Sequence, residues 1–94
     1  MNKPLIVSRH PGAIDWLQQY FPWLRDAEVR ESVTVSDVAG RVVVGNIPLF
    51  LAAECAAYYA IEFAGAPPRG AEYGVKEMVE SGARLTCYRV ERVG

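Results

Sequence analysis

The first part of the chain carries a short apolar run followed by an amphipathic one. Residues 5–7 are all apolar, which predicts a short buried strand over Pro4–Ser8. From Pro11 onward, apolar residues recur every three or four positions, as on one face of a helix. Proline is tolerated in the first helical turn but not in a helix interior. The pattern therefore predicts a helix that begins near Pro11 and ends or bends at Pro22.

The middle of the chain predicts two more strands and a second helix. Apolar and polar residues alternate in "VRESVTV", 29–35, as in a half-exposed strand near a sheet edge, and "SDVAG" after it is typical of a turn. The triple valine of "RVVVG", 41–45, predicts a central strand covered on both faces. The alanine-rich segment Leu49–Tyr58 predicts a helix.

The last third predicts a strand, a helix and a closing strand. "YAIEFAG", 59–65, is typical of a strand, although the residues from Tyr58 onward could instead prolong the preceding helix. After a rigid loop, "APPRG", helical spacing predicts a helix over Glu72–Gly82 with Gly82 as its C-cap. Alternation in "ARLTCYRVERV", 83–93, predicts a long strand.

This order of strands and helices predicts an α/β fold over a single domain, residues 1–94. We expect a small Rossmann-like domain of three layers, with a mostly parallel sheet of about five strands and three helices. The second and last strands have mixed faces, so we expect them at the edges of the sheet.

Composition and charge narrow the classes of ligand. The chain is 51% hydrophobic, which favours a folded globule over a disordered tail. Ten Lys and Arg residues against eleven Asp and Glu give a net charge of −1. Binding of long nucleic acid needs many phosphate contacts from a basic face, so we do not expect it. A small anionic ligand needs only a few local cations.

Two cysteines and one histidine argue against a metal site. Cys55, Cys87 and His10 cannot complete a tetrahedral zinc site unless carboxylates join them. We expect both cysteines to be buried free thiols, and we expect no metal and no cofactor. The N-terminus lacks a signal-peptide pattern, and no apolar run reaches the roughly 20 residues that span a bilayer. We therefore expect a cytoplasmic protein without membrane contact.

Two segments share one arrangement of strand, turn and helix. "LIVSRHPGAI", 5–14, and "VVVGNIPLFL", 42–51, each place a short polar turn and a proline between an apolar strand and a helix. In an open parallel sheet both turns lie at the carboxyl ends of strands, where ligands bind. The helix N-termini that follow carry unpaired N–H groups and a partial positive charge, which favour a phosphate.

Arg9 and His10 strengthen the expectation of an anion site at the first turn. Helix caps favour Ser, Thr, Asp or Asn, and a cation at a helix N-terminus is mildly unfavourable unless an anion lies there. Simpler roles stay open, since Arg9 could be a solvated loop residue and His10 could cap the helix. Likewise, Ser8 could bond only a backbone N–H of the turn, and Asn46 could be an ordinary N-cap.

Two catalytic classes are excluded by missing residues. An apolar strand followed by Arg-His resembles the start of the histidine phosphatases, but their covalent chemistry needs a second histidine, which this chain lacks. A Ser-His-Asp hydrolase is equally unsupported, because the chain has no G-x-S-x-G nucleophile elbow.

Several motifs together resemble one family of proteins. "VSRHPGAIDWL", "VVGNIPLFLAAE", a segment from Arg69 to Met78 and a terminal "Y.V" are similar to a short CRISPR-associated family from type III loci, the VVA-type family. The resemblance covers nearly the whole chain, except that "WLRDAEVRES", 23–32, matches no part of the pattern. It implies a Rossmann-like ring nuclease that binds and linearises cyclic oligoadenylate, with cyclic tetra-adenylate as the expected ring.

The resemblance also implies a mechanism and a partner. Ring nucleases of this kind need no metal, because the ribose 2′-OH attacks its own 3′-phosphate and leaves a 2′,3′-cyclic phosphate. Related ring nucleases are usually homodimers with the ring across the two-fold axis, so a few cations per subunit suffice. Cleavage would switch off type III antiviral signalling.

The implied roles fall on the two turns. Arg9 would bind the scissile phosphate, His10 would act as general acid or base, and Ser8 would complete the catalytic group. Backbone N–H groups over Pro11–Ala13 and near Asn46–Leu49 would add to the phosphate site. The ligand-binding residues would be Gly12, Gly45, Asn46 and Arg69.

Two other function classes fit the same sequence. The first is a sponge or sensor that binds the ring without cleaving it, which only turnover separates from a nuclease. The second is a protein–protein adaptor of the CRISPR system that docks through exposed aromatic residues. The candidates for that patch are Trp16, Tyr20 and Trp23.

Overall fold

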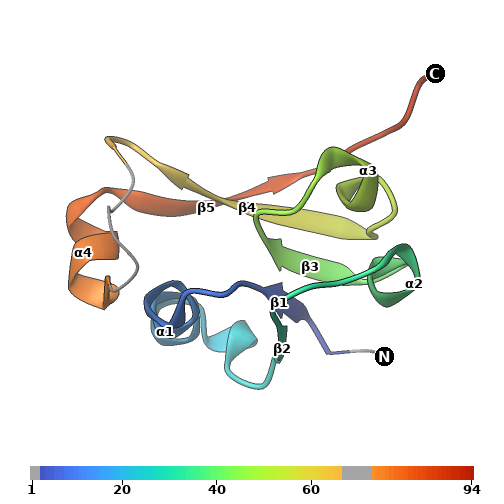
Figure 1. Ribbon diagram of the computed structural model, residues 1–94. Helices are drawn as coiled ribbons and strands as arrows, with labels where there is room; N and C mark the ends of the chain where they lie inside the picture. The colour runs from blue at the N-terminus through green and yellow to red at the C-terminus, as the bar shows by residue number, and fades with distance from the viewer. Residues whose placement is uncertain (1–2, 67–72) are drawn as a thin grey trace.

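A five-stranded sheet forms the middle layer of the computed structural model, which describes residues 3–66 and 73–94 (Figure 1). Its strands in chain order are β1 (Leu5–Val7), β2 (Glu28–Arg30), β3 (Val42–Gly45), β4 (Ala57–Phe63) and β5 (Ala83–Tyr88). Around it lie α1 (Pro11–Tyr20), the 3-10 helix η1 (Pro22–Leu24), α2 (Val35–Val38), α3 (Leu49–Ala52) and α4 (Val75–Glu80).

The strand order is β2-β1-β3-β4-β5. The first four strands in this order run parallel to one another. This confirms the predicted α/β fold class with a mostly parallel sheet, and it confirms that the second and last strands lie at the edges. β5 runs antiparallel to β4, with Phe63 opposite Ala83. The chain therefore leaves β4 and returns to β5 at the same end of the sheet, so α4 is not a crossover helix.

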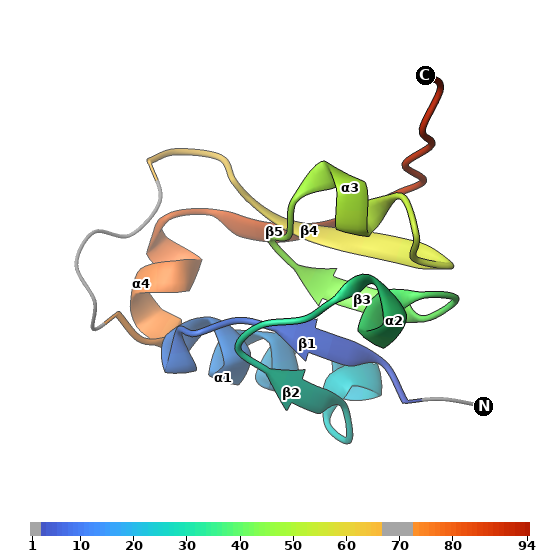
Figure 2. The same cartoon turned by 45° about the vertical axis from the view of Figure 1, so that its right-hand side comes forward.

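Two clusters of buried residues lie on opposite faces of the sheet. Ile6 and Val44 point toward α1 and α4, which pack beside each other (Figure 2). Leu5, Val7 and Val43 point toward the other face, which is covered by α2 and α3. Because side chains alternate between the faces and both faces are covered, β1 and β3 need consecutive apolar residues, as predicted.

The predicted strand over residues 29–35 is wrong beyond Arg30. Val35 begins α2, so "SDVAG" belongs largely to a helix and the described residues contain four α-helices instead of three. A capping box begins this helix: the Thr34 N–H donates a 2.7 Å hydrogen bond to Asp37 Oδ2. Asp37 stands at the N3 position, and this local polar bonding overrides the alternating pattern.

Other helices and strands are also shorter than predicted. α3 ends at Ala52, and Tyr58 onward is strand, because β4 pairs with both β3 and β5. The alternative that these residues prolong the helix is therefore wrong. α4 begins at Val75, and β5 ends at Tyr88. The C-cap of α4 is Ser81 and not Gly82 as predicted; Gly82 follows it with φ of 69°, the left-handed conformation in which glycine commonly ends a helix.

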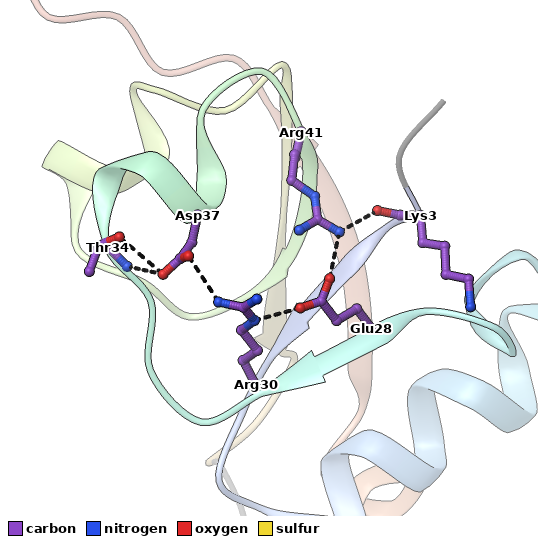
Figure 3. Close-up of polar contacts among 6 residues, drawn as sticks. All are labelled: Lys3, Glu28, Arg30, Thr34, Asp37 and Arg41. Carbon is purple, nitrogen blue, oxygen red and sulfur yellow. Dashed lines mark hydrogen bonds and ion pairs between the residues drawn. The ribbon is translucent and has the colours of Figure 1, made fainter.

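A polar network holds edge strand β2 against α2 and the start of β3 (Figure 3). The Arg30 guanidinium contacts Glu28 at 2.5 Å and Asp37 at 2.9 Å. Arg41 contacts Glu28 at 3.1 Å and donates a 2.8 Å hydrogen bond to the Lys3 carbonyl. The hydrogen bonds from Arg30 and Arg41 lower the pKa of the Glu28 carboxyl.

Candidate functional site

A cavity of about 460 Å³ opens at the carboxyl ends of the parallel strands. Residues of β1, β3, β4, α1 and α4 line it, together with residues that directly follow β1, β2 and β3. The lining consists of Val7, Ser8, Arg9, His10, Ala13, Glu31, Gly45, Asn46, Ile61, Phe63, Tyr73 and Met78. This is the end of an open α/β sheet where ligands are expected.

The turn after β1 is shaped by its own hydrogen bonds. The His10 N–H donates to Ser8 Oγ at 3.1 Å, and the Ser8 N–H donates to the Arg30 carbonyl at 3.0 Å. The His10 carbonyl then accepts the N–H groups of Ala13 and Ile14. His10 is therefore the backbone N-cap of α1, whose first residue is Pro11 as predicted, but the imidazole itself makes no capping bond.

The side chains of Arg9 and His10 are exposed and line the cavity. Arg9 forms no ion pair with any carboxylate of residues 3–66 and 73–94. The His10 ring lies 5.2 Å from the Tyr73 ring, centroid to centroid, at a tilt of 32°. Burial raises the pKa of the Tyr73 hydroxyl. A guanidinium and an imidazole thus lie beside the N-terminus of α1, where an anion is favoured.

The end of β3, which lies next to the end of β1 in the sheet, lines the adjoining part of the cavity. Gly45 has φ of 137°, and a Cβ there would lie 2.2 Å from the Val7 carbonyl oxygen, so the position requires glycine. Asn46 Oδ1 accepts a 3.3 Å hydrogen bond from the Ile61 N–H. Its side chain therefore joins β3 to β4 and is no N-cap of α3, where Pro48 holds that position.

Five of the seven predicted site residues line the cavity: Ser8, Arg9, His10, Gly45 and Asn46. Gly12 is buried outside the lining, and a Cβ there would lie 1.9 Å from the Tyr73 carbonyl oxygen. It permits the close approach of α1 to the segment before α4. The lining on the β3 side ends at Asn46, and the Ile47 N–H donates to the Tyr58 hydroxyl. Arg69 lies outside the described residues.

The sequence patterns missed two groups of lining residues. Glu31 directly follows β2, but the alternating pattern had placed it inside a longer strand. Its position at the carboxyl end of a parallel strand is the signal that could have found it. The second group is apolar and resembled ordinary core residues in the sequence. It consists of Val7, Ile61, Phe63, Tyr73 and Met78.

Most polar and apolar lining residues are separated along the sheet. The polar ones follow β2, β1 and β3, with the apolar Val7 and Ala13 among them, whereas the other apolar side chains come from β4, α4 and the segment before α4. A ligand with an anionic group at one end and an aromatic ring at the other matches this separation. Nucleotides have this chemistry, because phosphate suits the helix N-terminus and a base suits apolar side chains.

Other predicted features fall outside the cavity. Within residues 3–66 and 73–94, no three His, Cys, Asp or Glu side chains cluster as a metal site. Cys55 is half-buried, whereas Cys87 is exposed, so the prediction of two buried thiols is wrong for Cys87. Trp16 is only 3% exposed and belongs to the core, which leaves Tyr20 and Trp23 of the predicted aromatic patch. No helix in the described part of the chain has the length and apolarity needed to cross a membrane.

Comparisons with known proteins give one match. A family model described as "Putative CRISPR-associated protein (Cas_VVA1548)" matches residues 5–91. No curated protein and no solved structure matches the chain. The matched range includes every element of the fold and every residue that lines the cavity.

Proposed function

The chain belongs to this CRISPR-associated family, and on that premise we propose that it binds and linearises cyclic oligoadenylate. The proposal includes cyclic tetra-adenylate as the preferred ring and the silencing of type III antiviral signalling as the role. The observation that carries it is the cavity that Ser8, Arg9 and His10 share with an apolar wall formed by Ile61, Phe63, Tyr73 and Met78. Such a cavity offers separate places for the phosphate and the base of a nucleotide.

Phosphate recognition rests on the turn after β1. Arg9 supplies a charge that no described carboxylate neutralises, and the N-terminus of α1 supplies a partial positive charge at the same place. A phosphodiester held there would gain charge-assisted hydrogen bonds from the guanidinium. An overall charge of −1 does not oppose this binding, because the cations are local.

Base recognition rests on the other half of the cavity. Ile61 and Phe63 offer apolar surface, and the half-buried Tyr73 ring offers a stacking surface. Stacking of a base on an aromatic side chain contributes about 1–3 kcal/mol. The site therefore suits a purine ring that extends from the bound phosphate.

Chemistry in this site needs no external nucleophile. The 2′-OH of the bound nucleotide attacks the adjacent 3′-phosphate, and the products carry a 2′,3′-cyclic phosphate and a 5′-OH. Arg9 would stabilise the charge that develops on the phosphate, and His10 would exchange a proton with the reacting oxygens. We propose a homodimer for this reaction, because a two-fold pair would present one such cavity to each half of a ring.

The test is incubation of the protein with cyclic tetra-adenylate, with and without EDTA, followed by mass spectrometry of the products. Linear products in both samples are expected. Arg9→Ala and His10→Ala should each lower the rate about 100-fold or more, the usual scale of charge stabilisation and proton transfer. Arg25→Ala is the matched control, because Arg25 is exposed and lies outside the cavity.

Other outcomes would favour the rival functions. Tight binding of the ring without any turnover would identify a sponge or sensor. Absence of binding to cyclic tri-, tetra- and hexa-adenylate would overturn the proposal and favour an adaptor, whose candidate contacts are then the exposed Tyr20 and Trp23.

A further inference from the structure

Glu31 is an acidic residue in a cavity that otherwise suits an anion. Building on the proposed function, we infer that Glu31 is the general base of the reaction and accepts the proton of the attacking ribose 2′-OH. Glu31 lines the same cavity as Arg9 and His10. A carboxylate repels phosphate, so its presence there calls for a hydrogen-bond donor on the ligand, and ribose hydroxyl groups are such donors.

The backbone holds Glu31 beside the phosphate-binding turn. Val7 pairs with Arg30 in the parallel register of β1 and β2, and the Ser8 N–H donates to the Arg30 carbonyl at 3.0 Å. Glu31 is the next residue along the chain. The Arg30 side chain is itself held by Glu28 and by Asp37 of α2 (Figure 3). The edge strand therefore holds the backbone of Glu31 in place beside the turn.

The Glu31 side chain is free to contact a ligand. It is exposed, and it forms no hydrogen bond or ion pair with the side chains of residues 3–66 and 73–94. By contrast, the neighbouring carboxylates of Glu28 and Asp37 are both committed to guanidinium partners. Structural pairing thus explains those two acids but does not explain Glu31.

The strand order places Glu31 on one side of the phosphate and the apolar wall on the other. Adjacent strands lie about 4.8 Å apart, so the ends of β2, β1, β3 and β4 form a row. With the scissile phosphate at the turn after β1, the attacking ribose falls toward β2. The leaving nucleotide then falls toward β3 and β4, with its base against Ile61 and Phe63. In-line displacement requires attack and departure on opposite sides of phosphorus.

The resulting step is balanced. The Glu31 carboxylate takes the proton from the 2′-OH, and the 2′ oxygen forms a bond to phosphorus as the bond from phosphorus to the 5′ oxygen breaks. His10, whose ring lies against Tyr73 on the α4 side, donates a proton to the departing 5′ oxygen. The products are the 2′,3′-cyclic phosphate and the 5′-OH, and solvent restores both protein groups.

The experiment compares Glu31→Gln with the control Glu80→Gln, because Glu80 is exposed on α4 and lies outside the cavity. Single-turnover cleavage of cyclic tetra-adenylate should fall about 100-fold or more in Glu31→Gln and stay unchanged in Glu80→Gln. Affinity for a 2′-deoxy ring, which cannot be cleaved, should be unchanged or tighter in Glu31→Gln.

Two results would overturn the inference alone. One is a Glu31→Gln variant that cleaves at the wild-type rate. The other is loss of affinity for the 2′-deoxy ring, which would assign Glu31 to ligand binding or folding instead of proton transfer. A wild-type protein that neither binds nor cleaves the ring would overturn both this inference and the proposed function.

Discussion

The backbone N–H of Ser8 donates a 3.0 Å hydrogen bond to the carbonyl oxygen of Arg30, which joins the ends of β1 and β2 beside the cavity. Ser8 Oγ in turn accepts the His10 N–H at 3.1 Å. The turn that carries the candidate catalytic residues is therefore tied to an edge strand of only three residues. Changes that loosen this strand should also disturb the site.

The attachment of β2 to α2 should make stability depend on acidic pH. Hydrogen bonds from the Thr34 backbone and hydroxyl, assisted by Arg30, lower the pKa of Asp37. Because the pKa is lower in the folded state, ionised Asp37 stabilises the fold at pH values above the ordinary Asp pKa of about 3.9. This stabilisation is lost as the pH falls through the folded-state pKa. We expect Asp37→Asn to flatten the loss of stability between neutral pH and about pH 3, measured by urea unfolding.

Asp26→Asn is the matched control for this change. The Asp26 side chain is exposed and forms no hydrogen bond or ion pair with the described residues, so this variant should keep the wild-type pH dependence. Equal flattening in both variants would contradict the assignment to the Thr34–Asp37 cap.

Gly45→Ala should destabilise the protein and the cavity wall together. The added Cβ would lie 2.2 Å from the Val7 carbonyl oxygen, in a backbone conformation with φ of 137°. We expect a loss of about 2–3 kcal/mol or more in the free energy of unfolding. Gly40→Ala separates the effect of backbone strain from that of a steric clash. Gly40 has φ of 71°, but a Cβ added there would have no atom within 4 Å. It should lose about 1 kcal/mol, and an equal loss at both positions would refute the close contact.

Gly12→Ala should lower the free energy of unfolding, although the same substitution usually raises it in a helix. Alanine in place of glycine normally stabilises a helix interior by roughly 0.5–1 kcal/mol. Here the Cβ would lie 1.9 Å from the Tyr73 carbonyl oxygen, so α1 and the segment before α4 must separate. Urea unfolding should show clear destabilisation. Gly74→Ala, where the nearest atom is the flexible Glu77 Oε1 at 3.3 Å, should change little.

Asn46→Asp should weaken ring binding while the fold is retained. Aspartate keeps the oxygen that accepts the Ile61 N–H, but it adds a negative charge at the cavity and removes the amide donor. We expect at least tenfold weaker binding of a 2′-deoxy cyclic tetra-adenylate by calorimetry, which corresponds to about 1.4 kcal/mol. The urea midpoint should stay close to that of the wild type. Unchanged affinity would remove Asn46 from the binding site.

Local patterns in the sequence predicted the elements on which the site is built. Consecutive apolar residues predicted β1 and β3, because both faces of these strands are covered. Pro11 correctly marked the start of α1, since proline suits the first turn of a helix. These signals depend on neighbours along the chain. They therefore also located the turn with Ser8, Arg9 and His10.

The tertiary structure alone decided which segments meet. Three features depend on residues that are distant in sequence. They are the antiparallel pairing of β5 with β4, the contact of Gly12 with the Tyr73 carbonyl, and the place of Glu31 beside Ser8. Strand order and register determine such contacts. The spacing of apolar residues along the sequence contains no information about either of them. For the same reason, the apolar wall of the cavity was indistinguishable from core in the sequence, because burial against protein and burial against a ligand select the same side chains.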